Sequence, residues 1–279
     1  MVYRFQCRQC PFTIWSTSRD TIGDAVGTHI LGHHRERVTK QDFRIRWSCP
    51  HCERSGQHHD RDAGIERFER HLFEHVESSV ESGVHVADEF DRTGGVLVRA
   101  PRGSDGLDNA RVHFLSPGDI VLFVTTAPAE RIRLIDDALR EWPRRTIILT
   151  TKPDPLGDVS DLDLSEGSLE VVRLDSRLGL SEVGETISRI VGEYEDVGGK
   201  IAAEFDILPE LVEKFDLQTV FKFLHVLAVR FDRADALSHY HVDPRAQSKS
   251  TINVLDQVFD LSIEADDRRF IAGPHSELD

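Results

Sequence analysis

Apolar and polar positions alternate in blocks from about residue 94 onward, and these blocks predict strands and helices in turn. Short apolar runs predict buried strands, whereas apolar residues spaced three and four apart predict amphipathic helices. The predicted strands are Val96–Ala100, Ile120–Thr125, Thr146–Thr151, Leu169–Leu174, Lys200–Phe205, Leu237–Val242 and Leu261–Ala265. The predicted helices are Ala129–Glu141, Glu182–Tyr194, Leu217–Phe231 and Thr251–Phe259. This alternation predicts an α/β fold with a mostly parallel sheet flanked by helices.

The segment Met1–Val76 follows a different pattern, in which one set of metal-ligand residues occurs twice. Both sets have the spacing C-x2-C-x18-H-x3-H. The first set is Cys7, Cys10, His29 and His33, and the second, in the same register further along the chain, is Cys49, Cys52, His71 and His75. Two thiolates from a turn and two imidazoles from one helix face fill the tetrahedral shell of a structural zinc ion. The repeat therefore predicts two structural Zn²⁺ ions per chain, with no coordination position open to a substrate.

Two other interpretations of the cysteines stay open at this point. In one, all four cysteines bind a single zinc ion in a ribbon and the histidines are incidental, so the chain would hold one ion. In the other, the cysteines are disulfide-bonded or merely buried, which their metal-type spacing and the absence of a signal peptide disfavour. The additional histidines are expected to be solvated loop residues: His34, His51, His58 and His59.

The repeated pattern resembles tandem C2H2-type zinc fingers over roughly residues 3–76. This resemblance implies a small ββα unit at each ligand set and a nucleic acid or protein as partner. The x18 spacer between the inner cysteine and the first histidine is longer than that of ordinary fingers, which puts standard groove reading in question. If the partner is DNA or RNA, the basic residues expected to bind it are Arg19, Arg35, Arg37, Arg44, Arg46, Arg61, Arg67 and Arg70.

Charge is distributed unevenly between these two regions. The chain has 34 Lys+Arg against 49 Asp+Glu, whereas Met1–Val76 holds 12 Lys+Arg and 10 Asp+Glu. Only 6 of the Lys+Arg are lysines, and this acidic, lysine-poor composition resembles that of proteins from salt-loving archaea. At molar salt the Debye length is about 3 Å and phosphate contacts weaken steeply, so nucleic-acid binding would need base contacts or stacking. A protein partner is then a serious competitor.

Two features of composition bear on location. No run of eighteen apolar residues occurs, so no membrane-spanning helix is expected. All four cysteines belong to the metal-ligand pattern, which suits a reducing, cytoplasmic location.

The second region resembles haloarchaeal proteins of unknown function with a RecA/KaiC-like core, over roughly residues 94–267. The resemblance is most specific at Asp216–His225 (DLQTVFKFLH) and His239–Pro244 (HYHVDP). It implies a RecA-like α/β domain and brings no established activity. A P-loop needs G-x4-G-K-[ST], because its backbone and lysine hold the phosphates. The segment after the first predicted strand reads PRGSDGLD, and no lysine lies between Lys40 and Lys152. ATP hydrolysis by the usual mechanism is therefore not expected.

Two further groups in this region have candidate chemistry. His239, His241 and Asp243 share one face of a predicted strand, as a metal or acid–base set would, although polar packing at a strand end is favoured. Asp206 follows a strand as a Walker B acid does, but without a lysine partner an ordinary loop carboxylate is favoured.

These patterns predict a regulatory or adaptor protein whose fingers bind nucleic acid or protein, with a non-catalytic RecA-like domain that mediates association. The alternatives are an enzyme that uses the degenerate site and a purely structural interaction module. The predicted segments are fingers at 1–80, a linker at 81–93, the α/β domain at 94–270 and a tail at 271–279.

Overall fold

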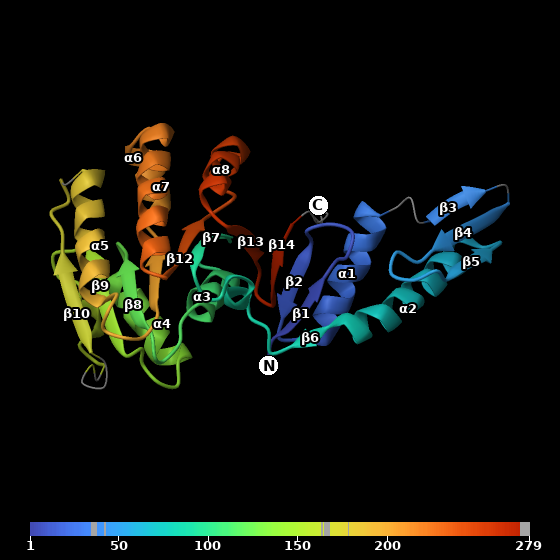
Figure 1. The fold of residues 1–279 in the computed structure, drawn as a ribbon, viewed down its shortest axis with the longest axis horizontal. Coiled ribbons are helices and arrows are strands. Elements are labelled where there is room, and N and C mark those ends of the chain that lie inside the picture. The colour runs from blue at the N-terminus through green and yellow to red at the C-terminus, as the bar shows by residue number, and fades with distance from the viewer. Residues whose placement is uncertain (35–37, 42, 163, 165–167, 178, 274–279) are drawn as a thin grey trace. The chain divides into compact units, whose positions relative to one another are not determined.

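The structure, a computed structural model, describes the chain except residues 35–37, 42, 163, 165–167, 178 and 274–279. The chain forms two compact units (Figure 1). The N-terminal unit consists of Met1–His85 and of the chain from Arg268 onward, and the α/β unit consists of Val86–Asp267. The described residues Arg268–Gly273 thus belong to the N-terminal unit, whereas the predicted α/β domain extended to residue 270.

The N-terminal unit contains two ββα arrangements, as predicted. The first consists of β1 (Tyr3–Gln6), β2 (Thr13–Ser16) and α1 (Arg19–His33), and the second of β4 (Arg44–Ser48), β5 (Ser55–His58) and α2 (Arg61–Ser79). The remaining strands are β3 (Val38–Gln41), β6 (Glu81–Ser82) and β14 (Arg269–Ala272). They extend the two hairpins into antiparallel sheets of order β14-β2-β1-β6 and β3-β4-β5.

The two ββα arrangements share one hydrophobic core. Phe5, Phe12 and Ile30 from the first arrangement belong to the same buried cluster as Trp47 and Phe68 from the second. The Gln9 side-chain amide also donates a hydrogen bond to the carbonyl of Pro50, at 3.2 Å. Neither arrangement therefore has a core of its own, and the two are expected to fold together.

Helix starts in this unit follow from side-chain caps. The hydroxyl of Ser18 accepts a hydrogen bond from the backbone N–H of Thr21, at 3.3 Å, at the beginning of α1. Asp60 accepts one from the N–H of Ala63, at 2.8 Å, just before α2. Each cap satisfies a backbone donor that the first turn of a helix leaves unpaired.

The α/β unit is built on one parallel sheet. Its strands are β7 (Gly94–Arg99), β8 (Ile120–Val124), β9 (Arg145–Thr150), β10 (Leu169–Arg173), β11 (Ile201–Phe205), β12 (Leu237–Val242) and β13 (Leu261–Ala265). Their order across the sheet is β10-β9-β8-β11-β12-β7-β13, and the pairings between them are parallel. The seven predicted strands of this region are confirmed with small shifts at their ends.

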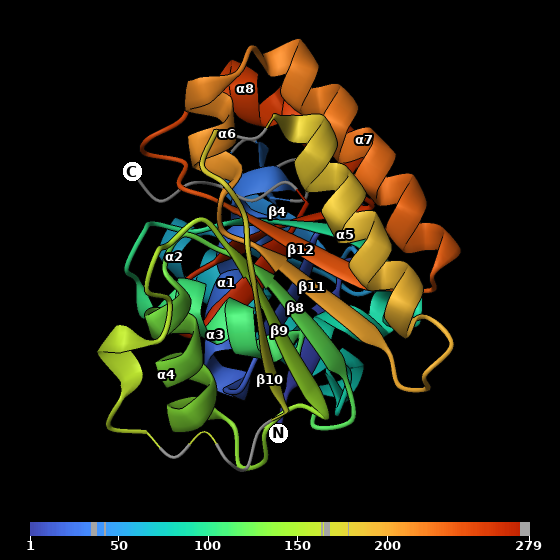
Figure 2. The ribbon, with the colours of Figure 1, turned by 90° about the vertical axis from the view of Figure 1, so that its left-hand side faces the viewer.

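Helices cover both faces of this sheet, as Figure 2 shows. The helices are α3 (Asp105–His113), α4 (Pro128–Ala138), α5 (Leu180–Tyr194), α6 (Leu208–Lys214), α7 (Leu217–Arg233) and α8 (Lys249–Leu255). Short 3-10 turns lie at Val86–Phe90, Gly157–Val159 and Asp256–Val258. Helices α3 and α4 lie on one face, and α5 to α8 lie on the other.

The predicted buried stripe of α7 is confirmed. Val220, Phe223, Leu224, Leu227 and Phe231 are all buried, and they pack in the larger core of the unit. Helices α3 and α6 were not predicted. Helix α3 is short and polar, and it begins at a Ser104 cap in the segment compared with a P-loop. None of the helices that the structure describes is both long and apolar enough to cross a membrane.

Helices after adjacent strands lie on opposite faces at the carboxyl edge of the sheet. Strand β8 leads into α4 on one face, and its neighbour β11 leads into α6 on the other. Such switch points open a crevice between the chain segments that leave the strands. A cleft is therefore expected at the carboxyl edge of the sheet in the α/β unit.

Candidate metal centres

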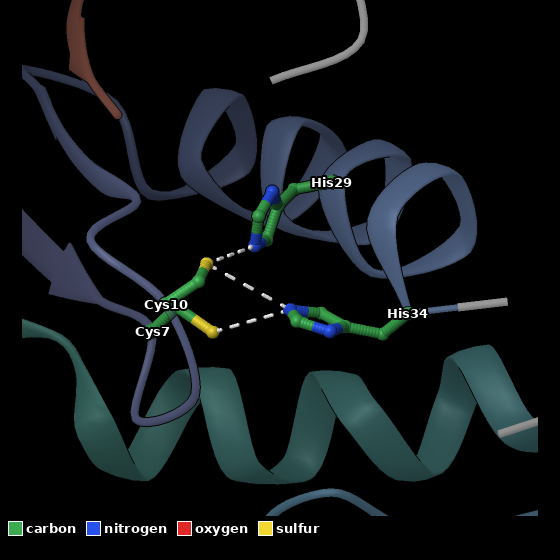
Figure 3. Close-up of side chains that lie close together, drawn as sticks. All are labelled: Cys7, Cys10, His29 and His34. Carbon is green, nitrogen blue, oxygen red and sulfur yellow. Dashed lines mark hydrogen bonds between the residues drawn. The ribbon is translucent and has the colours of Figure 1, made fainter. Parts of the chain in front are cut away.

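The first candidate metal centre lies where the β1–β2 turn meets the C-terminal end of α1 (Figure 3). A backbone hydrogen bond from Cys7 N–H to the carbonyl of Phe12, at 2.9 Å, closes the turn that carries both cysteines. Cys10 Sγ lies 3.3 Å from His29 Nε2, and the Phe12 ring stacks on the His29 imidazole at 3.8 Å between centroids. His34 Nε2 completes the group, at 3.6 Å from Cys7 Sγ and 3.8 Å from Cys10 Sγ.

The structure thus places His34, and not the predicted His33, beside the cysteines. Helix α1 ends at His33, which is exposed. His34 leaves the helical conformation, with φ −119° and ψ 37°, although its backbone N–H still bonds to the carbonyl of Ile30. This change of backbone direction aims His34 at the cysteines, and its side chain is 8% exposed where a solvated residue was expected. A helical i, i+4 spacing could not reveal a ligand that lies one residue past the end of the helix.

The second candidate metal centre contains the four predicted residues. Cys52 Sγ lies 3.3 Å from His71 Nε2 and 3.2 Å from His75 Nε2, and these two nitrogens are 3.2 Å apart. Cys49 on the opposite side of the turn completes the group. The backbone hydrogen bond from Cys49 N–H to the carbonyl of Arg54, at 2.9 Å, is the counterpart of the Cys7–Phe12 bond in the first centre.

The donor set of each centre fits a zinc ion. The four donor atoms in each group, two sulfurs and two imidazole nitrogens, lie within 4.8 Å of one another. Backbone N–H groups of His51 and Arg54 point at Cys49 Sγ and Cys52 Sγ, at 3.3 and 3.4 Å, which stabilises thiolates. His71 Nδ1 lies 3.4 Å from a Glu74 oxygen, the outer contact that orients a ligating histidine. Both centres could therefore hold Zn²⁺.

Burial also shifts the protonation of these groups. It raises the pKa of the Cys10 and Cys49 thiols, so a buried thiolate there needs a neighbouring cation. Burial, together with the nearby His71, lowers the pKa of His75, which favours the neutral imidazole that binds metal.

His51 lies near both centres. Its ring centroid is 5.8 Å from that of His75, and burial, followed by the charges of His75, Arg8 and His34, lowers its pKa. His51 and His58 are half-buried, where solvated loop residues were expected, whereas His59 is exposed as expected. The shared core thus brings the two centres close together.

The arginines predicted to bind nucleic acid lie in three places. Arg44 and Arg46 are exposed on β4, and Arg19 is exposed at the start of α1, over the Tyr3 ring at 4.9 Å. The three on α2 are also exposed: Arg61, Arg67 and Arg70. Arg70 pairs with Glu66 at 2.6 Å. Arg35 and Arg37 lie outside the described residues.

The α/β unit has a polar cleft at the carboxyl edge of its sheet, with a volume of about 630 Å³. Buried Arg111 and Arg131 meet the buried carboxylate of Glu204, at 2.8 and 3.9 Å, and Arg131 also lies 3.4 Å from Asp206. The Thr125 hydroxyl donates to Asp206 at 2.5 Å. Burial raises the pKa of both carboxyl groups. Only tertiary structure brings these residues together, and the sequence pattern carries no signal for Glu204, Arg111 or Arg131.

The predicted set of His239, His241 and Asp243 is only partly brought together. His239 and His241 share a face of β12 and are buried, with 3.0 Å between His239 Nδ1 and His241 Nε2. Asp243 lies beyond the strand and accepts backbone hydrogen bonds from Arg102 and Arg245. Burial, followed by the charge of Arg111, lowers the pKa of His239 to about 3, and burial also lowers the pKa of His241, which lines the polar cleft.

Comparison with protein families identifies the α/β unit. Residues 93–265, more than half of the chain, match the model of DUF7504, a family of unknown function. The chain belongs to this family. The predicted relation of this region to proteins of unknown function is thereby confirmed, whereas the tandem C2H2 assignment stays a prediction. Comparison with curated proteins finds no match.

Solved structures similar to this DUF7504 member include three from the archaeon Pyrococcus horikoshii. A KaiC-like protein, PH0186, is 15% identical over 71% of this chain and 88% of its own, with a TM-score of 0.44. PH0250 is 16% identical over 66% and 89%, with a TM-score of 0.43. PH0321, solved in complex with an unknown peptide, is 12% identical over 64% and 81%, with a TM-score of 0.42.

Proposed function

We propose that this protein is a regulatory adaptor whose N-terminal unit holds two structural Zn²⁺ ions, as tandem C2H2-like fingers do, and binds nucleic acid. The α/β unit serves as a non-catalytic scaffold. The observation that carries the proposal is the pair of Cys2His2 groups, each with four donor atoms within 4.8 Å. Zinc at each group would link a β-hairpin to its helix and so stabilise a unit with a small core.

The charge of the β3-β4-β5 sheet supports nucleic acid as the partner. Its strands read VTKQ, RIRWS and SGQH and contain no acidic residue, in a chain with 49 Asp+Glu among 279 residues. Arg44 and Arg46 are exposed on the middle strand. Basic strands without carboxylates in an acidic chain match the electrostatics of a phosphate backbone.

The ion pairs of the polar cleft support a non-catalytic α/β unit. Each arginine that lines the cleft has a carboxylate partner: Arg102 with Glu210, Arg111 with Glu204, Arg131 with Glu204 and Asp206, and Arg133 with Asp161. The described cleft lining contains no lysine. A nucleotide phosphate would therefore have to compete with existing ion pairs, and the β/γ-phosphate lysine of a P-loop has no counterpart.

The test uses the full chain. Metal analysis of purified protein is expected to find two zinc ions per chain, where a single-zinc ribbon would give one. Fluorescence anisotropy with labelled DNA and RNA pools, at low and at molar potassium chloride, is expected to show binding that a zinc chelator abolishes and added zinc restores. Two zinc ions without binding to any pool would overturn the nucleic-acid role and favour a protein partner or a purely structural module.

The enzyme alternative makes its own prediction. If the cleft hydrolysed ATP, turnover above background would be measurable and would fall on Asp206→Asn, because Asp206 is the carboxylate with the Walker B placement. We expect no turnover from either protein. We also propose that the α/β unit mediates self-association, which light scattering on the full chain tests.

A further inference from the structure

The two helices that would read a DNA groove in ordinary fingers offer little basic surface here. Helix α1 is buried along Ile22, Ala25, Val26 and Ile30, and Arg19 is its only arginine. Helix α2 buries Phe68 and Leu72, and the charges on its exposed face are mixed, with Arg70 paired to Glu66 at 2.6 Å. Further along α2, the acidic Glu74 forms an ion pair with Arg54. Neither helix therefore presents a cationic face to a duplex.

The β3-β4-β5 sheet has a better-suited face. Ile45 and Trp47 of β4 are buried on the side of α2, where Ile45 lies beside Gly64 and Trp47 packs on Phe68. Arg44 and Arg46 alternate with them and therefore lie on the opposite, outer face. The cross-strand register places Thr39 and Gln57 on either side of Arg46, and Gln41 beside Arg44. These side chains are exposed, and the Arg44 guanidinium bonds to the neutral Gln57 amide at 3.4 Å. We call these five residues and Ser55 the outer face.

The arginines of the outer face have no acidic partner among the described residues of the N-terminal unit. Ion pairs in this part of the chain join Arg4 to Glu81, Arg54 to Glu74 and Arg70 to Glu66. Amide and hydroxyl side chains between the arginines can donate to and accept from bases. The outer face thus combines phosphate-binding cations with groups that can contact bases.

An aromatic side chain stands at the edge of this face. Phe43 lies in the turn between β3 and β4, directly before Arg44, and is 91% exposed. No other large hydrophobic side chain that the structure describes is as exposed. An exposed aromatic ring beside arginines is the arrangement on which unpaired bases stack, whereas the bases of a duplex are already stacked on one another.

We infer that the outer face and Phe43 bind single-stranded nucleic acid, with a base stacked on Phe43 and the backbone phosphates held by Arg44 and Arg46. This inference rests on the proposed function and specifies its substrate class. Stacking depends weakly on salt, whereas phosphate contacts weaken with a slope of about −0.7 per phosphate on a double-logarithmic plot. The two kinds of contact can therefore be separated experimentally.

The test measures anisotropy of labelled 12-nucleotide single strands and the matching duplex with the zinc-loaded full chain, between 0.1 and 2 M potassium chloride. We expect single strands to bind at least ten times tighter than the duplex. Phe43→Ala should weaken single-strand binding about 5- to 100-fold at every salt concentration without changing the slope. Arg44→Gln with Arg46→Gln should reduce the slope by about 1.4.

The matched control is Arg61→Gln with Arg67→Gln, which removes two exposed arginines from α2. Although the sequence pattern alone selects both arginines, this helix variant should weaken binding much less than the strand variant does, and all variants should retain two zinc ions per chain. If the helix variant weakens binding as much as the strand variant, or if the duplex binds as tightly as the single strand, the inference is wrong while the proposed function survives. Absence of binding to every nucleic acid would overturn both the inference and the proposed nucleic-acid role. In that case, binding to anionic lipid vesicles that is lost in Phe43→Ala would identify the outer face as a membrane contact.

Discussion

Replacing His34 by alanine tests the most specific difference between the sequence pattern and the structure. His34 Nε2 lies 3.6 Å from Cys7 Sγ and 3.8 Å from Cys10 Sγ, so the change removes one of the four candidate metal donors (Figure 3). The matched control is His33→Ala, which removes the adjacent, exposed imidazole that the H-x3-H spacing selects. The two variants differ only in which neighbouring histidine is lost.

The expected magnitude follows from the free energy of structural zinc binding. This free energy is roughly 10–16 kcal/mol for four ligands, so one ligand contributes about 2.5–4 kcal/mol if the four are equivalent. Loss of His34 should therefore weaken zinc at the first centre about 10²- to 10³-fold. Because water can replace the imidazole, the loss is expected to fall toward the lower end of this range.

Competition with a chromogenic zinc chelator measures this affinity on the full chain. His34→Ala should release one ion readily and retain the second, whereas His33→Ala should hold both as the parent protein does. Cobalt substitution gives an independent readout, because the visible absorption of tetrahedral Co²⁺ changes when a nitrogen ligand is lost. Loss of the ion from His33→Ala, with His34→Ala unaffected, would refute the assignment of His34 and restore the ligand that the spacing predicts.

Three further predictions follow from buried groups. The pKa of His239 is lowered from 6.5 to about 3 in the folded state, so protonation of the unfolded chain should reduce stability as pH falls from 6.5 toward 3, by up to about 1.4 kcal/mol per pH unit. Urea unfolding across this range should show that the free energy of unfolding depends less steeply on pH in His239→Gln than in the parent protein. An equal pH dependence would contradict the burial of a neutral ring. Gly56→Ala would place a Cβ 2.5 Å from the Trp47 indole, and overpacking should lower the free energy of unfolding by about 1–3 kcal/mol, with Gly27→Ala, which has open space around it, as the control. Phe68→Ala should lower the free energy of unfolding by about 3–5 kcal/mol, because Phe68 belongs to the core shared by both ββα arrangements. Chelator competition should then show a lower zinc affinity at both centres. A lower affinity at the second centre alone would mean that the two arrangements fold independently.

Local patterns in the sequence were sufficient for most of the secondary structure. The apolar runs between Val96 and Ala265 correspond to the seven strands of the parallel sheet. A strand that is covered by helices on both faces needs apolar side chains on both faces, and its sequence is therefore a nearly continuous apolar run. The stripe of Leu217–Phe231 predicted α7 because apolar residues three and four apart share one face of a helix. Helix α3 escaped prediction because its residues are mostly polar, and its position is set by the Ser104 cap and by packing.

Close spacing along the chain also predicted seven of the eight candidate metal ligands that the structure groups. Cys49 and Cys52 share one tight turn, and His71 and His75 share one helix face, so local geometry alone brings each pair together. The same holds for Cys7 and Cys10. The exception is His34, whose direction depends on where α1 stops, and a helix end is decided by capping and packing rather than by periodicity.

Tertiary structure alone decided the contacts between distant segments. Strand β14 pairs with β2, and the Ser16 hydroxyl donates to the carbonyl of Arg268, near the other end of the chain. Glu204 meets Arg111 and Arg131 only because the sheet order brings β11, α3 and α4 to one edge. A pairing of this kind depends on the summed packing of the whole unit, and no local pattern of residues encodes it. Local sequence thus determined the secondary-structure elements and the turns that carry the cysteines. Packing of the whole unit decided which residues pair with the buried charges, where strand β14 pairs and which surface stays exposed.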